Sequence, residues 1–273
     1  MPIFRISASD SGWLPPTLEA LSYAGCAIVT DVVDSDTLAQ TRDAARETQK
    51  RIRSDVGEDR LDRAGELGVL RLMLAYEPFF LRFLELPEVL AVVDATVSES
   101  SILHLQNGLV LPPVADDTPD VFQLRFHMDF PRVLGELMSV NTFFAIDEFT
   151  AENGGTILAP GSHQSKTAPS EEYLRAVCVT AECPPGSMIV FDSTLWHAAG
   201  RNHSGRDRIA INQQFTRSYI KQQVDYVRAL GDDFVLEQRP RTQQLLGWYT
   251  RVVTSLDEFY RPPEERLYRS GQG

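Results

Sequence analysis

The sequence is poor in the features of secreted and membrane-spanning proteins. Its three cysteines, Cys26, Cys178 and Cys183, form neither an even set nor a Cys-x-x-Cys pair, so we expect reduced thiols and an intracellular protein. The first residues lack the apolar core of a signal peptide, and no run of about 18 apolar residues occurs. These absences predict a cytoplasmic protein without a transmembrane helix.

Positive charge is also scarce. The chain has 26 Lys and Arg residues against 38 Asp and Glu residues, a net charge of −12 at pH 7 and a pI near 4.9. Phosphate backbones and anionic membrane surfaces are bound by clustered Lys and Arg. We therefore expect a small molecule as the partner, and neither a nucleic acid nor a membrane. The oligomeric state, monomer or homodimer, stays open.

The remaining composition is that of an ordinary globular protein. Hydrophobic residues make up 43% of the chain and charged residues 23%, and no segment is of low complexity. A chain of 273 residues is long for an average domain, but β-barrels and sandwiches of this length often fold as one unit. We expect a single domain over residues 1–273, with a helical N-terminal part at about 1–98, a β core at about 99–217 and a helical C-terminal tail at about 218–273.

The hydrophobic pattern of the first third is mainly helical. It predicts, in order, a helix over Thr17–Tyr23, a buried strand over Gly25–Val33, a helix that is capped at Asp34–Asp36 and ends near Ile52, a charged loop over Arg53–Glu66, and helical packing over Leu67–Val97.

From Ser101 the hydrophobic period changes to two, which is typical of strands. We expect strands at Ser101–Val110, Val121–Asp129, Ser139–Ile146, Gly155–Leu158, Arg175–Thr180, Ser187–Asp192 and Arg208–Phe215, separated by Pro- and Gly-rich turns. Many short strands in series predict a mainly β fold with flanking helices, either a barrel or a jelly roll. The last residues, Glu265–Gly273, are expected to be unstructured.

A histidine and a carboxylate suggest a metal site within the predicted strand Val121–Asp129. His127 and Asp129 are two residues apart, so in a regular strand both side chains point to the same face. His197 follows a Pro-Pro-Gly turn and an apolar strand, which places it near a strand end. Two histidines and one carboxylate form the ligand set that suits non-haem Fe(II) oxygenases.

Arg208 stands eleven residues beyond His197, at the head of a predicted strand and after a turn-rich stretch. A hairpin there would return Arg208 to the neighbourhood of the metal. A guanidinium group can hold a carboxylate with two parallel hydrogen bonds. This is what a 2-oxo acid that binds the metal through its other end requires.

Three motifs in order resemble the phytanoyl-CoA dioxygenase family of Fe(II)- and 2-oxoglutarate-dependent oxygenases. They are His-Met-Asp at 127–129, ENGGTILAPGSH at 152–163 and WHAAGRNHSGRDR at 196–208, and the resemblance covers roughly residues 20–250. It implies a double-stranded β-helix (jelly-roll) core, Fe(II) on His127, Asp129 and His197, and 2-oxoglutarate on Arg208, which has the family's spacing and is preferred over Arg206. O2 would be the oxidant, succinate and CO2 the coproducts, and ascorbate a supporting reductant.

The resemblance also implies the outcome of the reaction. Related halogenases have a small residue where this chain has Asp129, so hydroxylation of an unactivated C–H bond of a natural product, amino acid or lipid-like molecule is expected. Desaturation, epoxidation or cyclisation by the same oxidant is the alternative. A jelly-roll protein that binds metal and ligand without turnover and a zinc hydrolase are readings of other classes.

Further candidate residues lie beside the metal strand. His104 and Gln106 alternate on one face of the preceding strand, and Gln106 is a candidate cofactor-binding residue that would contact 2-oxoglutarate. Gln123 and Arg125 share the predicted face of His127, so Arg125 is expected either to meet an anionic ligand or to form an internal ion pair. Two segments, Leu111–Asp120 and Phe130–Met138, are expected to close the site. The remaining histidines, His163 and His203, are expected to be structural and exposed, respectively.

Overall fold

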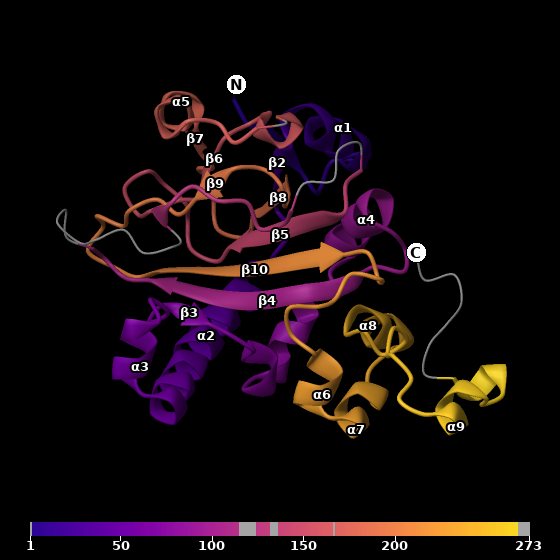
Figure 1. Cartoon of the computed structure of the whole chain (residues 1–273). Helices are drawn as coiled ribbons and strands as arrows, with labels where there is room; N and C mark the ends of the chain where they lie inside the picture. The colour runs from indigo at the N-terminus through magenta and orange to yellow at the C-terminus, as the bar shows by residue number, and fades with distance from the viewer. Residues whose placement is uncertain (1, 115–123, 132–135, 166, 267–273) are drawn as a thin grey trace.

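The computed structural model describes residues 2–114, 124–131, 136–165 and 167–266 (Figure 1). Its strands are β1 (Phe4–Ser7), β2 (Cys26–Thr30), β3 (Val69–Leu70), β4 (Ile102–Leu111), β5 (Ser139–Ala145), β6 (Ile157–Leu158), β7 (Val179–Thr180), β8 (Met188–Asp192), β9 (His197–Ala198) and β10 (Arg208–Thr216). Its α-helices are α1 (Leu14–Ala24), α2 (Ser35–Val56), α3 (Glu58–Arg63), α4 (Pro87–Thr96), α5 (Glu171–Val177), α6 (Tyr226–Leu230), α7 (Asp232–Leu236), α8 (Pro240–Leu245) and α9 (Leu256–Phe259).

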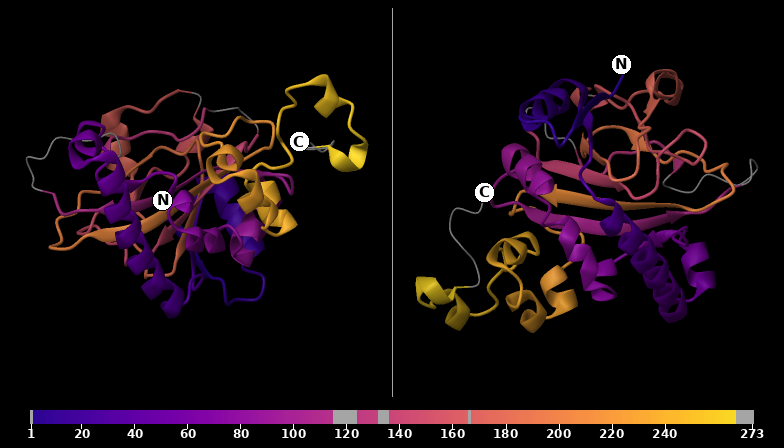
Figure 2. Two further views of the ribbon diagram at one scale, coloured as in Figure 1. Left: turned by 90° about the horizontal axis from the view of Figure 1, so that it is seen from below. Right: turned by 180° about the vertical axis from the view of Figure 1, so that it is seen from behind.

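Two sheets form the core of the fold. The larger sheet has the strand order β1-β2-β8-β5-β10-β4-β3, and its described pairings are antiparallel except that of β1 with β2. The smaller sheet has the order β7-β6-β9 and lies over one face of the larger one (Figure 1). Helices α2, α3 and α6–α8 cover the opposite face in both Figure 1 and Figure 2. The predicted jelly-roll core with flanking helices is confirmed.

Strand β5 shows why the central strands read as continuous apolar runs. Val140 and Phe144 pack into the cluster beneath the helices, whereas Phe143 and Ala145 pack into the cluster on the side of the smaller sheet. Successive side chains of a strand point to opposite faces, and here both faces are covered. Each large apolar side chain that is fully buried contributes about 1.5–3 kcal/mol.

The N-terminal part contributes strands as well as helices. Strands β1, β2 and β3 lie at the two ends of the larger sheet, so the sheet extends beyond the β core expected from the sequence. The segment Leu67–Val97, predicted to be helical, contains β3, two 3₁₀ turns at Met73–Ala75 and Pro78–Phe83, and helix α4. Proline at the start of a helix and short apolar runs made the longer helical pattern misleading.

Three other predicted elements differ from the structure. The charged segment Arg53–Glu66 holds helix α3, and Arg175–Thr180 holds the end of helix α5 followed by β7. In the described part of Val121–Asp129, His127 forms only an isolated bridge to His197 and no strand. Residues 115–120 and 132–135 of the two segments predicted to close the site lie outside the described residues, as do residues 121–123 of the predicted strand.

Candidate metal and cosubstrate site

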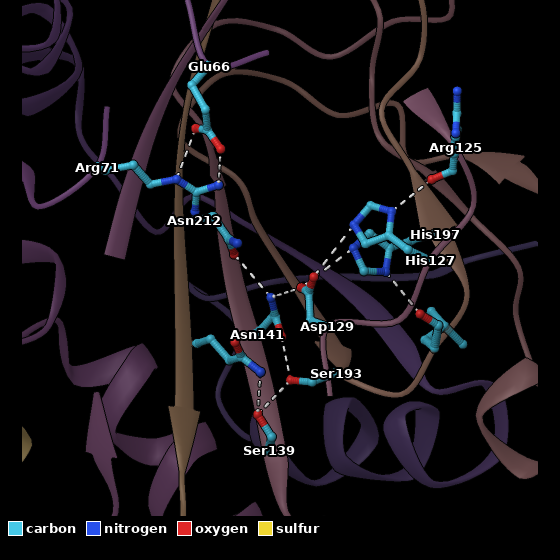
Figure 3. Close-up of polar contacts among 12 residues, drawn as sticks. Glu66, Arg71, Arg125, His127, Asp129, Ser139, Asn141, Ser193, His197 and Asn212 are labelled. Carbon is cyan, nitrogen blue, oxygen red and sulfur yellow. Dashed lines mark hydrogen bonds and ion pairs between the residues drawn. The ribbon is translucent and has the colours of Figure 1, made fainter. Parts of the chain in front are cut away.

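His127, Asp129 and His197 converge on one point of the cavity between the sheets (Figure 3). One potential ligand atom of each residue lies within 4.8 Å of the other two. The Nε2 atoms of His127 and His197 lie 3.6 and 3.5 Å from the carboxylate oxygens of Asp129, and the two ring centroids are 4.4 Å apart. The predicted ligand set is therefore assembled from segments far apart in the chain.

Backbone pairing holds the two histidines side by side. The amide nitrogen of His127 donates to the carbonyl of His197 at 2.9 Å, and the amide nitrogen of His197 donates back at 3.0 Å. Each ring also donates from Nδ1 to a carbonyl two residues earlier, His127 to Arg125 at 2.8 Å and His197 to Leu195 at 2.9 Å. These bonds fix the tautomer in which Nε2 carries the free lone pair, which is the form that ligates a metal ion.

The pKa of His127 agrees with this role. Burial lowers this pKa below its ordinary value and the neighbouring His197 lowers it further, while the carbonyl of Arg125 and the carboxylate of Asp129 act in the opposite direction. The ring is neutral near pH 7, so it does not form an ion pair with Asp129. The two side chains instead place two potential metal-ligand atoms next to each other.

Asn141 on β5 holds the carboxylate ligand in place. Its side-chain amide donates to Oδ2 of Asp129 at 2.8 Å, and its own side-chain oxygen accepts from the hydroxyl of Ser193. Ser193 is in turn hydrogen-bonded to Ser139 at 2.8 Å, and its carbonyl accepts from the backbone of Asp129 at 2.9 Å. Within the described residues no donor binds Oδ1 of Asp129, so that oxygen is available to a metal ion (Figure 3).

Asn141 was not among the residues predicted from the sequence. The signal was a single carboxamide in a strand whose other residues are largely apolar, SVNTFFA. A fully buried amide needs hydrogen-bond partners, and Asn141 is fully buried. The partner could not be identified because a sequence does not show which residues face each other across the core.

Arg208 is buried at the start of β10, with 3% of its surface exposed. Its guanidinium carbon lies 4.2 Å from the centroid of the Phe149 ring, and its Nε and Nη1 atoms have no hydrogen-bond partner in the described part of the chain. Burial lowers the pKa of Arg208 to about 10, with Asp147 acting in the opposite direction. A charged group with unpaired buried donors is costly, which fits a site for an anion. Arg206, the rival, is exposed.

A cavity of about 510 Å³ joins the metal ligands to Arg208. Pockets of this size hold small-molecule ligands. The residues fit the expected cofactors: two imidazoles and a carboxylate suit Fe(II), and a buried guanidinium with unpaired donors suits the distal carboxylate of 2-oxoglutarate.

Gln106 does not contribute to this cavity. Its side chain points to the helical side of the sheet, where Nε2 donates to the carbonyl of Phe80 at 3.0 Å. The prediction that it faces the cosubstrate assumed a regular strand. In β4, however, Leu105 pairs with Gln214 and Leu103 with Phe215, which leaves His104 as the extra residue of a β-bulge. The bulge reverses the alternation, so His104 lines the cavity and Gln106 does not.

The other candidates lie away from the metal ligands. Arg125 is exposed and its side chain extends away from the imidazoles in Figure 3; it contributes only its backbone carbonyl. Gln123 lies outside the described residues. His163 is placed at the PGSH turn with Nε2 3.3 Å from the carbonyl of Ser22, and it is not part of the cavity wall.

Comparisons with known proteins agree with this geometry. A model of the family "Phytanoyl-CoA dioxygenase (PhyH)" matches residues 22–210. The relative "Uncharacterized protein Rv1501" of Mycobacterium tuberculosis is 61% identical over 270 residues, which are 98% of this chain and 99% of the relative. "Dioxygenase andF" of Emericella variicolor is 32% identical over 161 residues, which are 58% of this chain and 53% of the relative.

Among solved structures, the fold is similar to the crystal structure of EctD from S. alaskensis with 2-oxoglutarate and 5-hydroxyectoine. The TM-score is 0.60, with 18% sequence identity over 77% of this chain and 78% of EctD. This likeness concerns the fold, and the family match extends over more than half of the chain. This chain therefore belongs to the phytanoyl-CoA dioxygenase family and is a dioxygenase that depends on Fe(II) and 2-oxoglutarate.

Proposed function

We propose that this dioxygenase hydroxylates a C–H bond of a small molecule, with Fe(II) on His127, Asp129 and His197 and the distal carboxylate of 2-oxoglutarate on Arg208. One observation carries the proposal: a buried guanidinium with unpaired donors shares a cavity with the three-residue metal site. When bound here, Fe(II) would supply the chemistry that activates O2 for attack on a C–H bond, coupled to oxidative decarboxylation of 2-oxoglutarate to succinate and CO2.

The protein's own residues have separate tasks in this reaction. Arg208 neutralises and orients the distal carboxylate, and the ring of Phe149 supports its guanidinium group from one side. The carbonyls of Arg125 and Leu195 keep both imidazoles in the ligating tautomer. The buried position of Arg208 excludes water from its contact with the carboxylate, which strengthens the attraction.

Asp129 favours hydroxylation over halogenation. Its carboxylate occupies the metal-ligand position that a halide would need, and Asn141 anchors it there. The site residues do not differ between hydroxylation and desaturation, since both begin with removal of a hydrogen atom from the substrate.

The experiment follows the heavy isotope of oxygen. Protein with Fe(II), 2-oxoglutarate and ¹⁸O2 is incubated with a small-molecule extract of the host cells, and products are compared by mass spectrometry with those of the Asp129→Ala variant. We expect one ¹⁸O atom in succinate and one in a substrate. A substrate that only loses two hydrogen atoms would support desaturation, and absence of labelled succinate would contradict the proposal.

A further inference from the structure

The imidazole of His104 lines the cavity. The β-bulge in β4 places it there, and its buried Nδ1 atom has no hydrogen-bond partner within the described residues. Its backbone carbonyl accepts from the backbone amide of Gln223 at 3.2 Å, and its ring and that of Phe130 form a T-shaped pair with centroids 6.2 Å apart. The backbone is thus fixed, while Nδ1 of the ring is left without a hydrogen-bond partner in the described part of the chain.

The ring of His104 is neutral near pH 7. Burial lowers its pKa below the ordinary value, and the negative charge of Asp129 only partly opposes this effect. A neutral imidazole offers one donor and one acceptor. Uncharged oxygen groups, such as a hydroxyl that both donates and accepts or a carbonyl that accepts, are therefore suitable partners.

The register of the sheet separates His104 from the proposed cosubstrate site. Arg208 pairs with Leu111 at one end of β4, and His104 lies seven residues back along the same strand. At about 3.3 Å per residue these positions are roughly 20 Å apart. A five-carbon dicarboxylate that is held by Arg208 and the metal ion does not span this distance, so His104 belongs to the part of the cavity that remains for the substrate.

Charged side chains in the described cavity wall are largely neutralised or already assigned. The guanidinium group of Arg71 is paired with Glu66 through two hydrogen bonds of 3.0 and 2.7 Å, and Asp62 is exposed. Asp129 and Arg208 belong to the proposed metal and cosubstrate positions. The described wall is otherwise rich in apolar side chains: Leu67, Val69, Leu105, Leu109, Leu111 and Leu124. Such a wall favours a substrate without formal charge.

We infer that His104 is a substrate-binding residue that hydrogen-bonds a hydroxyl or carbonyl group on an uncharged, largely apolar substrate. This inference rests on the proposed function, because the proposed function assigns the part of the cavity next to Arg208 to the cosubstrate. The hydrogen bond satisfies the ring and orients the apolar body of the substrate near the metal.

Three ten-carbon probes with the same hydrocarbon body test this assignment: decan-1-ol, decanoate and decylammonium. Each is titrated by calorimetry into protein loaded with Fe(II) and 2-oxoglutarate without oxygen. We expect decan-1-ol to bind about 10-fold more tightly than either charged probe. His104→Leu should weaken decan-1-ol binding by about 10-fold, while His104→Gln, which keeps a donor and an acceptor, should stay within about 3-fold of the wild type.

The control is His203→Leu, which changes an exposed histidine outside the described cavity wall; it should leave all three affinities unchanged. Equal binding of the charged probes, failure of decan-1-ol to bind, or unchanged decan-1-ol affinity in His104→Leu would overturn the inference. If His104→Leu does not fold, His104→Gln is the deciding variant. The inference is overturned if His104→Gln binds decan-1-ol as weakly as the wild type binds the charged probes. Failure of the proposed function can be told apart from failure of this inference. The former would appear as a lack of 2-oxoglutarate turnover, whereas probe binding is measured separately by calorimetry.

Discussion

Asn141 is the residue on which the position of the carboxylate ligand most depends. Asp129 lies outside any regular strand, so it is not positioned by the backbone hydrogen bonds of a sheet. Hydrogen bonds to the Asn141 amide and the Ser193 carbonyl position it instead. Asn141→Leu should lower the affinity for Fe(II), or for Mn(II) as its substitute, by about 10–100-fold, since loss of a residue that orients a metal ligand has this typical cost. Metal titration of the wild type and the variant measures it.

Two variants sharpen the Asn141 prediction. Thr142→Val changes the next residue, whose side chain bonds to Gln213 and lies outside the cavity wall, and it should retain metal affinity. Asn141→Asp has the same shape but no donor for Oδ2 of Asp129; because its added negative charge also attracts the cation, its metal affinity should fall less than that of Asn141→Leu. Wild-type affinity in both Asn141 variants would show that the amide does not position Asp129.

Arg208 is predicted to serve binding at the expense of stability. Its pKa is lowered to about 10 because burial disfavours the charged form in the folded state, so the folded protein holds this proton less tightly than the unfolded chain does. Arg208→Met removes a costly buried charge, and the melting temperature should be unchanged or higher. Affinity for 2-oxoglutarate should fall about 100-fold or more.

Calorimetry of 2-oxoglutarate binding and thermal melts check both halves of the Arg208 prediction. The control is Arg206→Met, which changes an exposed arginine two residues away and should alter neither quantity. A variant that binds 2-oxoglutarate normally would remove Arg208 from the site. A large fall in melting temperature with normal binding would make it a structural residue.

At the scale of elements, the turns around the site depend on two glycines in different ways. Gly154 has φ +76°, and an added Cβ would lie 2.6 Å from the carbonyl oxygen of Gly200; Gly161 has φ +85° with nothing within 4 Å of such a Cβ. Gly161→Ala should lower the free energy of unfolding by about 1–2 kcal/mol, because alanine is strained in the left-handed backbone conformation. Gly154→Ala has the same strain and adds a clash with the backbone, so it should lower the free energy of unfolding by clearly more.

Thermal melts of the two alanine variants measure this difference. With about 2–4 °C of melting temperature for each kcal/mol in a protein of this size, the Gly154 variant should melt several degrees below the Gly161 variant. Equal decreases would mean that the turn at Gly154 relaxes around the added methyl group.

The elements also show where sequence reasoning succeeds. β5, β8 and β10 were predicted within one or two residues because their apolar runs are bounded by turns. The segment at His127 was predicted as a strand and forms only one bridge, and the bulge at His104 was not foreseen. Both errors concern register: a sequence gives the alternation of a strand but does not show where one extra residue interrupts it.

At the scale of the whole molecule, the thiols are predicted to differ in reactivity. Burial raises the pKa of Cys26 to about 12 and that of Cys183 to about 11, and it also raises the pKa of Cys178, which is only half-buried. At pH 8 the thiolate fraction of the two buried residues is very small. Ellman's reagent should therefore modify one thiol of the native protein rapidly, and all three after denaturation. Rapid reaction of all three native thiols would contradict the packing of β2 and of the Cys183 segment.

The fold class, a jelly-roll core with flanking helices, and the metal ligands could be predicted from the sequence, whereas the surroundings of the site could not. The motifs at His127, His197 and Arg208 have fixed spacings that indicate the family, and the family match confirms it. Asn141 and Phe149 contact site residues from segments distant in the chain, and His104 reaches the cavity wall through a bulge. The net charge of the chain gave no information about these residues, since the few residues of a cavity wall hardly change the net charge. Among the described residues, no helix combines the length and apolar character needed to cross a membrane.

The most direct measurement is an anaerobic titration of the protein with Fe(II) and 2-oxoglutarate, followed by its visible spectrum. We expect a weak charge-transfer band that saturates at one equivalent of each, is absent in His197→Ala and Asp129→Ala, and requires a much higher 2-oxoglutarate concentration in Arg208→Met. Absence of the band in the wild type, or an undiminished band in Asp129→Ala, would contradict the assignment of this site.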